Sequence, residues 1–125
     1  MKRNNQVTLD GLIEAVRLEI AAIRGEHIPA VHFRVRTDQP ELGGVHPAVA
    51  YGRLAAEIVV FSETAKEAKA PLEATVRGWL RTMWQDGQPH VILVADRVTF
   101  HLPSEVRARA SAQLSAYMQG APSSA

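Results

Sequence analysis

The sequence predicts a small α+β domain, with a mostly antiparallel sheet of about three strands covered by two to three helices in the order α-β-β-α-β-α. Its 125 residues match the commonest size of one domain, and its 46% apolar and 22% charged residues are ordinary globular values. Apolar residues recur at helical spacing in some segments and alternate in others. We therefore expect a single domain over residues 1–120 and a flexible tail over residues 121–125.

A first helix is predicted over residues 9–24. Its apolar residues recur three and four positions apart, the spacing of one helix face: Leu9, Leu12, Ile13, Val16, Ile20 and Ile23. Gly25 follows where a left-handed residue commonly ends a helix. Leu18 lies off the stripe, which makes it a candidate for a second contact surface.

Two strands and a long loop are expected next. Alternation over residues 31–37 predicts a strand with Val31, Phe33 and Val35 on one face and His32, Arg34 and Arg36 on the other. Residues 38–52 lack periodicity and contain several glycines and prolines, which predicts a long loop. Residues 54–63 are apolar on both faces, which favours a second strand, central in the sheet and antiparallel to the first.

The remaining chain predicts a helix, a strand and a helix. Residues 64–67 form a capping box, and an apolar stripe continues after Pro71 to a helix end at Gly87. A strand is expected over residues 91–102, where Asp96 interrupts the apolar face and favours a β-bulge over a turn. A last helix starts at Ser104 and ends at Gly120.

The segment Ile58-Val59-Val60-Phe61-Ser62-Glu63-Thr64-Ala65-Lys66-Glu67-Ala68, followed by Leu72, Val76, Arg77 and Leu80, resembles phage tail-terminator and tail-completion proteins. In those families a helix, a strand, a long loop and a second strand ending at an aromatic residue precede an Ala/Glu-rich helix. The resemblance covers about half of the chain. It implies a ring-forming virion subunit that uses the long loop for contacts.

No motif supports catalysis. The chain has no cysteine, so disulfides, thiolate metal sites and cysteine nucleophiles are excluded. It has no nucleophile elbow and no glycine-rich phosphate loop. We therefore assign no catalytic residue, no metal site and no cofactor, and the chain is not favoured as an enzyme. A small ligand-binding domain or enzyme around His32 and His101 remains an alternative, should the first and third predicted strands pair.

Basic side chains on one strand face suggest an anion or nucleic-acid binder as a second alternative. The anion-binding candidates are His32, Arg34, Arg36, Arg97 and His101. A solvated sheet face is the competing interpretation and is preferred, because the net charge is only +1 and no aromatic residues interleave with the basic ones.

Large apolar residues without an assigned place in the core favour a protein–protein interface. The interface candidates are Leu18, Val45, Val49, Tyr51, Trp79, Trp84 and Tyr117. The main prediction is therefore a non-enzymatic interaction module that acts through homo-oligomerisation or contact with another protein, for example as a virion tail-completion subunit. Nucleic acid is the less favoured partner. With no signal peptide and no apolar run long enough to span a bilayer, a cytoplasmic protein without membrane contact is expected.

Overall fold

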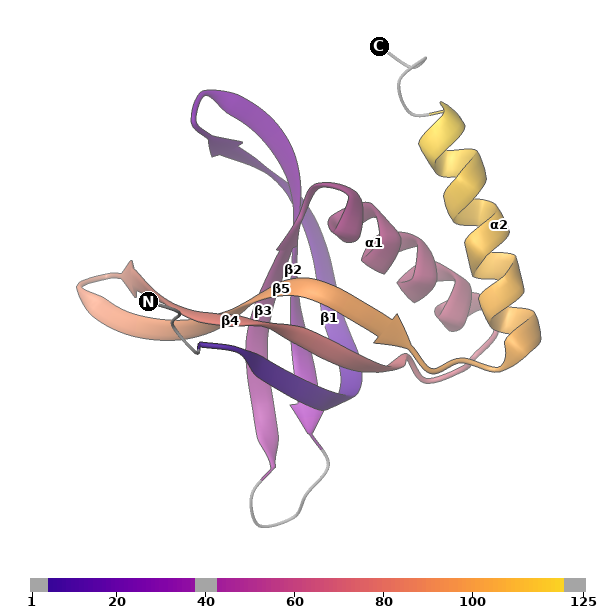
Figure 1. The fold of residues 1–125 in the computed structure, drawn as a ribbon, viewed down its shortest axis with the longest axis horizontal. Helices are drawn as coiled ribbons and strands as arrows, with labels where there is room; N and C mark the ends of the chain where they lie inside the picture. The colour runs from indigo at the N-terminus through magenta and orange to yellow at the C-terminus, as the bar shows by residue number, and fades with distance from the viewer. Residues whose placement is uncertain (1–4, 38–42, 121–125) are drawn as a thin grey trace.

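The computed structural model describes residues 5–37 and 43–120, and within these residues it contains five strands and two helices. The elements are β1 (Val7–Ile23), β2 (Glu26–Thr37), β3 (Gly44–Tyr51), α1 (Gly52–Glu67), β4 (Glu73–Gln85), β5 (Gln88–Phe100) and α2 (Ser104–Gly120). The strands close into a barrel in the order β1-β2-β3-β5-β4 (Figure 1). All neighbouring strands are antiparallel except β3 and β5, which are parallel.

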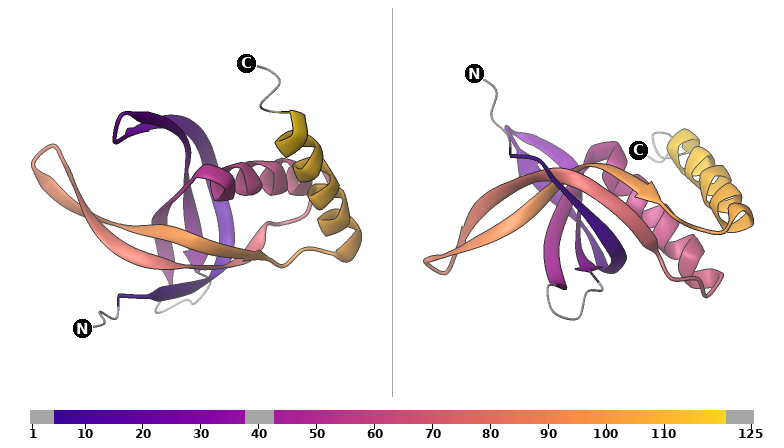
Figure 2. Two further views of the ribbon diagram at one scale, coloured as in Figure 1. Left: turned by 45° about the horizontal axis from the view of Figure 1, so that its top comes forward. Right: turned by 60° about the horizontal axis from the view of Figure 1, so that its bottom comes forward.

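Two hairpins extend beyond the closed part of the barrel. The β1–β2 hairpin turns at Arg24-Gly25, and the β4–β5 hairpin turns at Asp86-Gly87. All four turn residues have positive φ, between 51° and 79°, as the type I′ turn requires. We call residues 79–94 the β4–β5 arm. Figures 1 and 2 show both hairpins projecting from the side of the barrel that lies away from α2.

Helix α1 packs against the barrel and shares its apolar core. Ala55, Ile58, Phe61 and Ala65 on one face of α1 join inward residues of all five strands in one buried cluster. The rings of Phe61 and Phe100 stack with their centroids 4.3 Å apart, which ties α1 to β5. Helix α2 then packs on α1 through Val106 and Ala110, so both helices lie at one end of the molecule.

The predicted first helix is wrong, because residues 9–23 lie within strand β1 and Arg24 begins the turn that follows it. A register shift between Glu14 and Arg17 interrupts the pairing with β2, and Ala15 has a left-handed φ of 55°. This bulge changes which side chains point inward. Core contacts consequently fall at Leu9, Ile13 and Val16, spaced four and three residues apart. A bulged strand thus reproduced the spacing of a helix face.

The predicted fold class, a sheet of about three strands, is wrong, because five strands close into a barrel. Three further predicted elements are also wrong. Residues 54–63 form most of α1 instead of a strand, because buried positions such as Ala55, Ile58 and Ala65 follow helical spacing despite the β-branched run between them. Much of the predicted loop 38–52 is strand β3, and residues 38–42 lie outside the described residues. The predicted helix after Pro71 is strand β4.

Other predictions are confirmed. Residues 31–37 lie in β2 with the predicted facing, since Val31, Phe33 and Val35 are buried while His32 is half-buried. Strand β5 covers most of residues 91–102, and the predicted bulge is present: Arg77 pairs with Arg97 and Gly78 with Ala95, which leaves Asp96 unpaired. The last helix spans Ser104–Gly120 as predicted. The predicted tail, residues 121–125, lies outside the described residues.

Candidate functional site

The outer face of β1, β2 and β3 carries a row of basic side chains. Strand β2 turns His32, Arg34 and Arg36 to this face, because the residues between them fill the barrel. The bulge in β1 sets Arg17 directly opposite His32 in the ladder. We call Arg17, His32, Arg34 and Arg36 the basic face. Its other side is bounded by β3, where Val49 pairs with His32 and Pro47 pairs with Arg34.

Acidic side chains neutralise the basic face only in part. Glu14 pairs with Arg36 at 2.9 Å, and Glu19 contacts the imidazole of His32 at 2.8 Å. Among the residues described, Arg34 has no carboxylate within ion-pair distance, and its side chain is exposed. Arg34 therefore keeps a guanidinium fork that is free to bind an anion.

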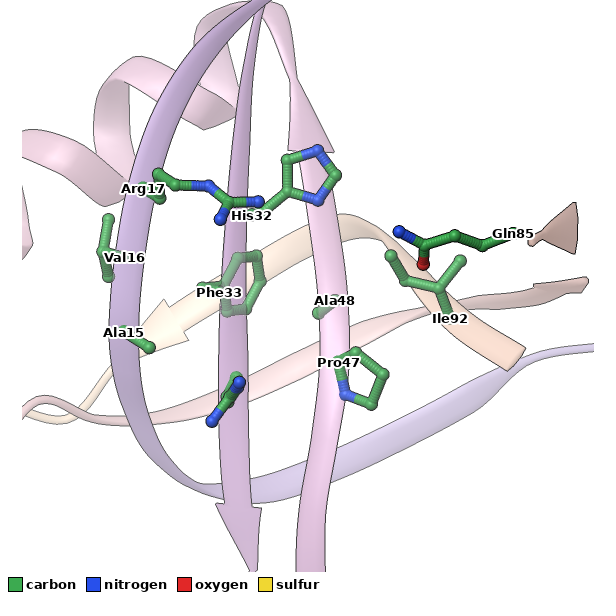
Figure 3. A pocket seen from close by; sticks show the side chains of 10 residues that line it. Ala15, Val16, Arg17, His32, Phe33, Pro47, Ala48, Gln85 and Ile92 are labelled. Atoms are coloured by element: carbon green, nitrogen blue, oxygen red, sulfur yellow. The ribbon is translucent and has the colours of Figure 1, made fainter. Parts of the chain in front are cut away.

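A hollow of about 570 Å³ opens on the basic face. Its lining includes the buried residues Phe33 and Ala48 and the polar residues Arg17, His32, Arg34 and Gln85. Figure 3 shows Arg17 and His32 on one side of the hollow and Gln85 and Ile92 of the β4–β5 arm on the other. The volume is in the range of sites that hold small organic ligands.

The β4–β5 arm continues the basic face with aromatic and basic side chains. In the arm's ladder Trp79 pairs with Val94 and Arg81 pairs with Ile92, so all four share one face. Val94 and Ile92 pack against Val49 of β3, which turns this arm face toward the basic face. Trp79 remains 43% exposed. The guanidinium of Arg81 donates a hydrogen bond to the hydroxyl oxygen of Tyr51 at 3.1 Å.

The opposite face of the arm is uncharged and mostly apolar, with Thr82 between Leu80 and Trp84. Leu80, Trp84 and Val91 alternate with the first set and are exposed, and Trp84 reaches 72% exposure. The side chain of Asn5 donates to and accepts from the backbone of Leu80, at 3.0 and 3.3 Å. The two tryptophans of the chain thus lie on opposite faces of a single two-stranded arm.

The structure brings three of the predicted anion-binding residues together and separates two. His32, Arg34 and Arg36 lie on one strand face, whereas Arg97 lines a different hollow with Arg53, Glu57 and Asp96. His101 follows β5, and its imidazole lies 2.8 Å from the hydroxyl of Thr75. Strands β2 and β5 do not pair, so the arrangement that would join His32 and His101 in one site is not formed.

The predicted interface residues are scattered over the molecule. Val49 is buried in the sheet, whereas Tyr51 is half-buried and bonded to Arg81. Leu18 is exposed beside α1, and Val45 is exposed on β3. Tyr117 is exposed on helix α2, whereas Trp79 and Trp84 are exposed on strand β4 in the β4–β5 arm.

One carboxyl group beside the second hollow has a shifted pKa. Burial of Glu57 on α1 raises the pKa of its carboxyl group above the ordinary value, and the nearby Arg53 guanidinium opposes this by lowering it. The groups beside it, Asp96 and Arg97, belong to β5. Glu57 lies outside the basic face, so its shift bears on stability.

The described residues contain neither a cluster of metal ligands nor a membrane-spanning helix. Residues 5–37 and 43–120 hold no group of three potential metal ligands close enough to share an ion. Of the helices in this part of the chain, neither has the length and apolarity needed to cross a membrane.

Chemically, this surface combines what a single nucleic-acid strand requires. Guanidinium groups attract the phosphate backbone, and an exposed indole offers a flat face on which an unpaired base can stack. This combination could not be predicted from the helix expected between Pro71 and Gly87, which contains both tryptophans. The Asp86-Gly87 pair, a favoured type I′ turn flanked by apolar residues, was the available signal for a hairpin there.

Comparison with solved structures identifies the fold. The SSB domain of a Synechococcus sp. protein matches with a TM-score of 0.51 and 17% identity over 81% of this chain and 99% of the other. The single-stranded DNA-binding protein of Thermus aquaticus matches with a TM-score of 0.52 and 18% identity, over 79% of this chain and 41% of that protein. A small single-stranded DNA-binding protein from Mycoplasma pneumoniae matches with a TM-score of 0.50 and 19% identity over 78% and 93%.

At this level of identity the likeness establishes the fold, which is a five-stranded oligonucleotide-binding (OB) barrel. No protein-family model matches the chain, and no curated protein sequence does either. The resemblance to phage tail-terminator proteins is therefore wrong: the residue pattern that carries it, read as a strand followed by a helix, belongs to helix α1 and strand β4 of a barrel.

The main functional prediction, a module acting through homo-oligomerisation or protein–protein contact, is contradicted too. The structures that share this fold are named as single-stranded DNA-binding proteins, which favours the nucleic-acid alternative. The ranking of nucleic acid as the less favoured partner is wrong for the same reason. Its premise, that no aromatic residue accompanies the basic ones, fails because Trp79 and Arg81 share an arm face next to β3.

Proposed function

We propose that this protein binds single-stranded nucleic acid on the outer face of β1–β3 and on the β4–β5 arm. The observation that carries the proposal is the exposed Trp79 on the same arm face as Arg81, next to the basic face. In OB barrels the face of strands 2 and 3 and the loops between strands 1–2 and 4–5 are the usual places for an oligonucleotide. The two hairpins occupy those loop positions here.

Stacking favours a single strand over a duplex. An indole can stack only on a base whose face is free, and the bases of a duplex are covered by their neighbours. Trp79 and Trp84 are exposed on a two-stranded arm that is narrow enough for a flexible strand to contact either face. The bound strand then places phosphates along Arg81, Arg34 and Arg17.

Electrostatics supports modest, salt-sensitive affinity. With a formal net charge of +1, the chain has no general attraction for polyanions, so local guanidinium groups must supply the contacts. Each phosphate neutralised on a single strand adds about −0.7 to the slope of log K against log salt. Three arginine contacts therefore predict a slope of about −2.

Intrinsic fluorescence tests the proposal directly, because Trp79 and Trp84 are the only tryptophans. We expect an unlabelled strand of about 16 thymidines, the upper site size for one OB barrel, to quench this fluorescence. Substituting Trp79→Ala should weaken binding by about 5- to 150-fold, the range expected for loss of one stacked base. The variant Trp84→Ala tests the other arm face in the same titration.

Tyr117→Ala is the matched control, since it removes an equally exposed aromatic ring from α2. Its affinity for the strand should equal that of the wild type. The proposal is overturned if the strand causes no quenching at about 50 mM salt, or if Trp79→Ala and Tyr117→Ala bind equally well.

Two further properties belong to this proposal. We place the protein in the cytoplasm, which is consistent with its lack of cysteine. We also expect residues 1–120 to act as one domain, since a single buried cluster includes residues from all five strands and both helices. Limited proteolysis that leaves one fragment of this size tests the domain assignment.

A further inference from the structure

A carboxylate lies at the end of the basic face that is formed by Arg17 and His32. Glu19 extends from β1 so that one of its oxygens, Oε1, lies 2.8 Å from Nε2 of His32 and 3.7 Å from the guanidinium of Arg17. A single oxygen atom is thus shared between two groups that bind anions. This is the arrangement that a phosphate oxygen would adopt at the same place.

The surroundings of Glu19 suit exchange with an external anion. The side chains of Glu19 and Arg17 are 48% and 73% exposed, so the carboxylate can turn into solvent without breaking a buried contact. Exposed ion pairs contribute at most about 1 kcal/mol, which a charge-assisted bond to phosphate can replace. The hollow lined by Arg17, His32 and Arg34 provides the space beside the pair.

Additional donors border the same space. Arg34 lies two residues from His32 on the same strand face, and within the described part of the chain no carboxylate pairs with it. Gln85 reaches the hollow from the β4–β5 arm and can donate through its amide. An anion that replaces the Glu19 carboxylate would therefore meet donors from β1, β2 and β4.

We propose that the Arg17–His32–Arg34 hollow is a subsite for one internal phosphodiester of the bound strand, and that Glu19 is an internal competitor which this phosphate displaces. The inference rests on the proposed function, since the phosphate belongs to the same strand that stacks on the arm. In this proposal Glu19 weakens strand binding, because a phosphate must first displace the Glu19 carboxylate from Arg17 and His32.

The test compares Glu19→Gln with Glu26→Gln. Both variants remove one negative charge from the β1–β2 hairpin, but Glu26 is exposed at the start of β2 and makes no ion pair within the described residues. Fluorescence titration with the unlabelled thymidine strand should show about fivefold tighter binding for Glu19→Gln, near the upper value of an exposed ion pair. Glu26→Gln should change the affinity by less than about twofold.

A double-mutant cycle locates the effect at Arg17. The loss of affinity caused by Arg17→Gln should be larger in the Glu19→Gln background, because Arg17 then gives up no internal partner when it binds phosphate. The cycle is run with strands that carry or lack a 5′-phosphate. The gain in affinity caused by Glu19→Gln should be equal for the two kinds of strand, as expected for an internal phosphodiester. A gain confined to 5′-phosphorylated strands would overturn that assignment.

Failure of this inference is distinct from failure of the proposed function. If wild type, Glu19→Gln and Glu26→Gln all bind the strand with the same affinity, or if both variants gain equally, the subsite is overturned while strand binding stands. If none of the three proteins binds the strand, the proposed function fails and the subsite falls with it.

Discussion

Arg81 of β4 donates a hydrogen bond from its guanidinium to the hydroxyl oxygen of Tyr51, the last residue of β3, at 3.1 Å. The two residues are 30 positions apart in sequence, and this bond joins the β4–β5 arm to the edge of the basic face. The bond positions the guanidinium of Arg81, which follows Trp79 on the same arm face and is paired in the ladder with Ile92, a residue that lines the hollow with His32. The arm's geometry relative to the barrel therefore depends in part on this contact.

Arg81→Gln tests the contribution of this cation to strand binding. Loss of one phosphate contact should lower the steepness of log K against log salt by about 0.7, so the defect shrinks as salt increases. Titrations at several salt concentrations measure the slope. Arg107→Gln removes an exposed arginine from α2 and should leave both slope and affinity unchanged. Equal slopes for Arg81→Gln and wild type would exclude Arg81 from the interface.

Tyr51→Phe separates the position of Arg81 from its charge. The variant keeps the half-buried ring and the cation but removes the hydrogen-bond acceptor. Affinity should fall by about two- to twelvefold, the equivalent of one hydrogen bond, with the salt slope unchanged. If Tyr51→Phe lowered the slope of log K against log salt as much as Arg81→Gln does, the phosphate contact of Arg81 itself would depend on the Tyr51 hydroxyl.

Gly78 is predicted to be essential for the fold at the base of the arm. A Cβ atom there would lie 2.0 Å from the carbonyl oxygen of Val94 on the paired strand, a backbone atom that cannot move aside cheaply. Gly78→Ala should destabilise the protein by about 1–3 kcal/mol or more, as overpacking does. Gly44→Ala is the control, because its Cβ would meet only the His46 ring at 3.8 Å. Urea denaturation followed by circular dichroism compares the two variants.

Glu57 predicts a pH dependence of stability. Burial raises the pKa of its carboxyl group in the folded state, so the folded protein holds this proton to higher pH than the unfolded chain does. Stability is therefore lost as pH rises from the pKa of the unfolded chain through the raised pKa of the folded protein, and the cost is complete above the folded pKa. Glu57→Gln removes this cost.

The measurement is the thermal midpoint of Glu57→Gln at pH 7 and pH 4. The midpoint should rise relative to wild type at pH 7, and the gain should shrink at pH 4, where the wild-type carboxyl holds more of its proton. Glu67→Gln, an exposed position at the end of α1, serves as the control and should shift neither midpoint. A gain that is larger at pH 4 than at pH 7 would reverse the sign of the argument.

Sequence patterns recovered the elements whose periodicity is uninterrupted. Strand β2 alternates strictly over residues 31–37, and α2 begins at Ser104 and ends at Gly120, both of which are boundary signals in the sequence, so each element was predicted with the correct type. Asp96 was correctly taken as a bulge because a charge interrupts an otherwise alternating strand. The basic side chains of β2 followed from the same alternation.

Elements that depend on tertiary contacts were not predictable in this way. The bulge at Ala15 gives β1 the spacing of a helix, and the exposed half of β4 has no buried face to impose alternation. Ile58-Val59-Val60 favours a strand by local propensity, yet the barrel requires a helix to cover its open end. Since Trp79 and Trp84 belong to the misassigned segment, the aromatic half of the candidate site was lost with it.

The central claim is that a single nucleic-acid strand occupies the outer face of β1–β3 and the β4–β5 arm. Backbone amide NMR spectra of the intact protein, recorded with and without the thymidine strand, test its existence and its location together. We predict that the largest shift changes fall on residues 28–36 and 79–92, with α2 residues 104–119 unaffected. Spectra that do not change, or changes that centre on α2, would contradict the account.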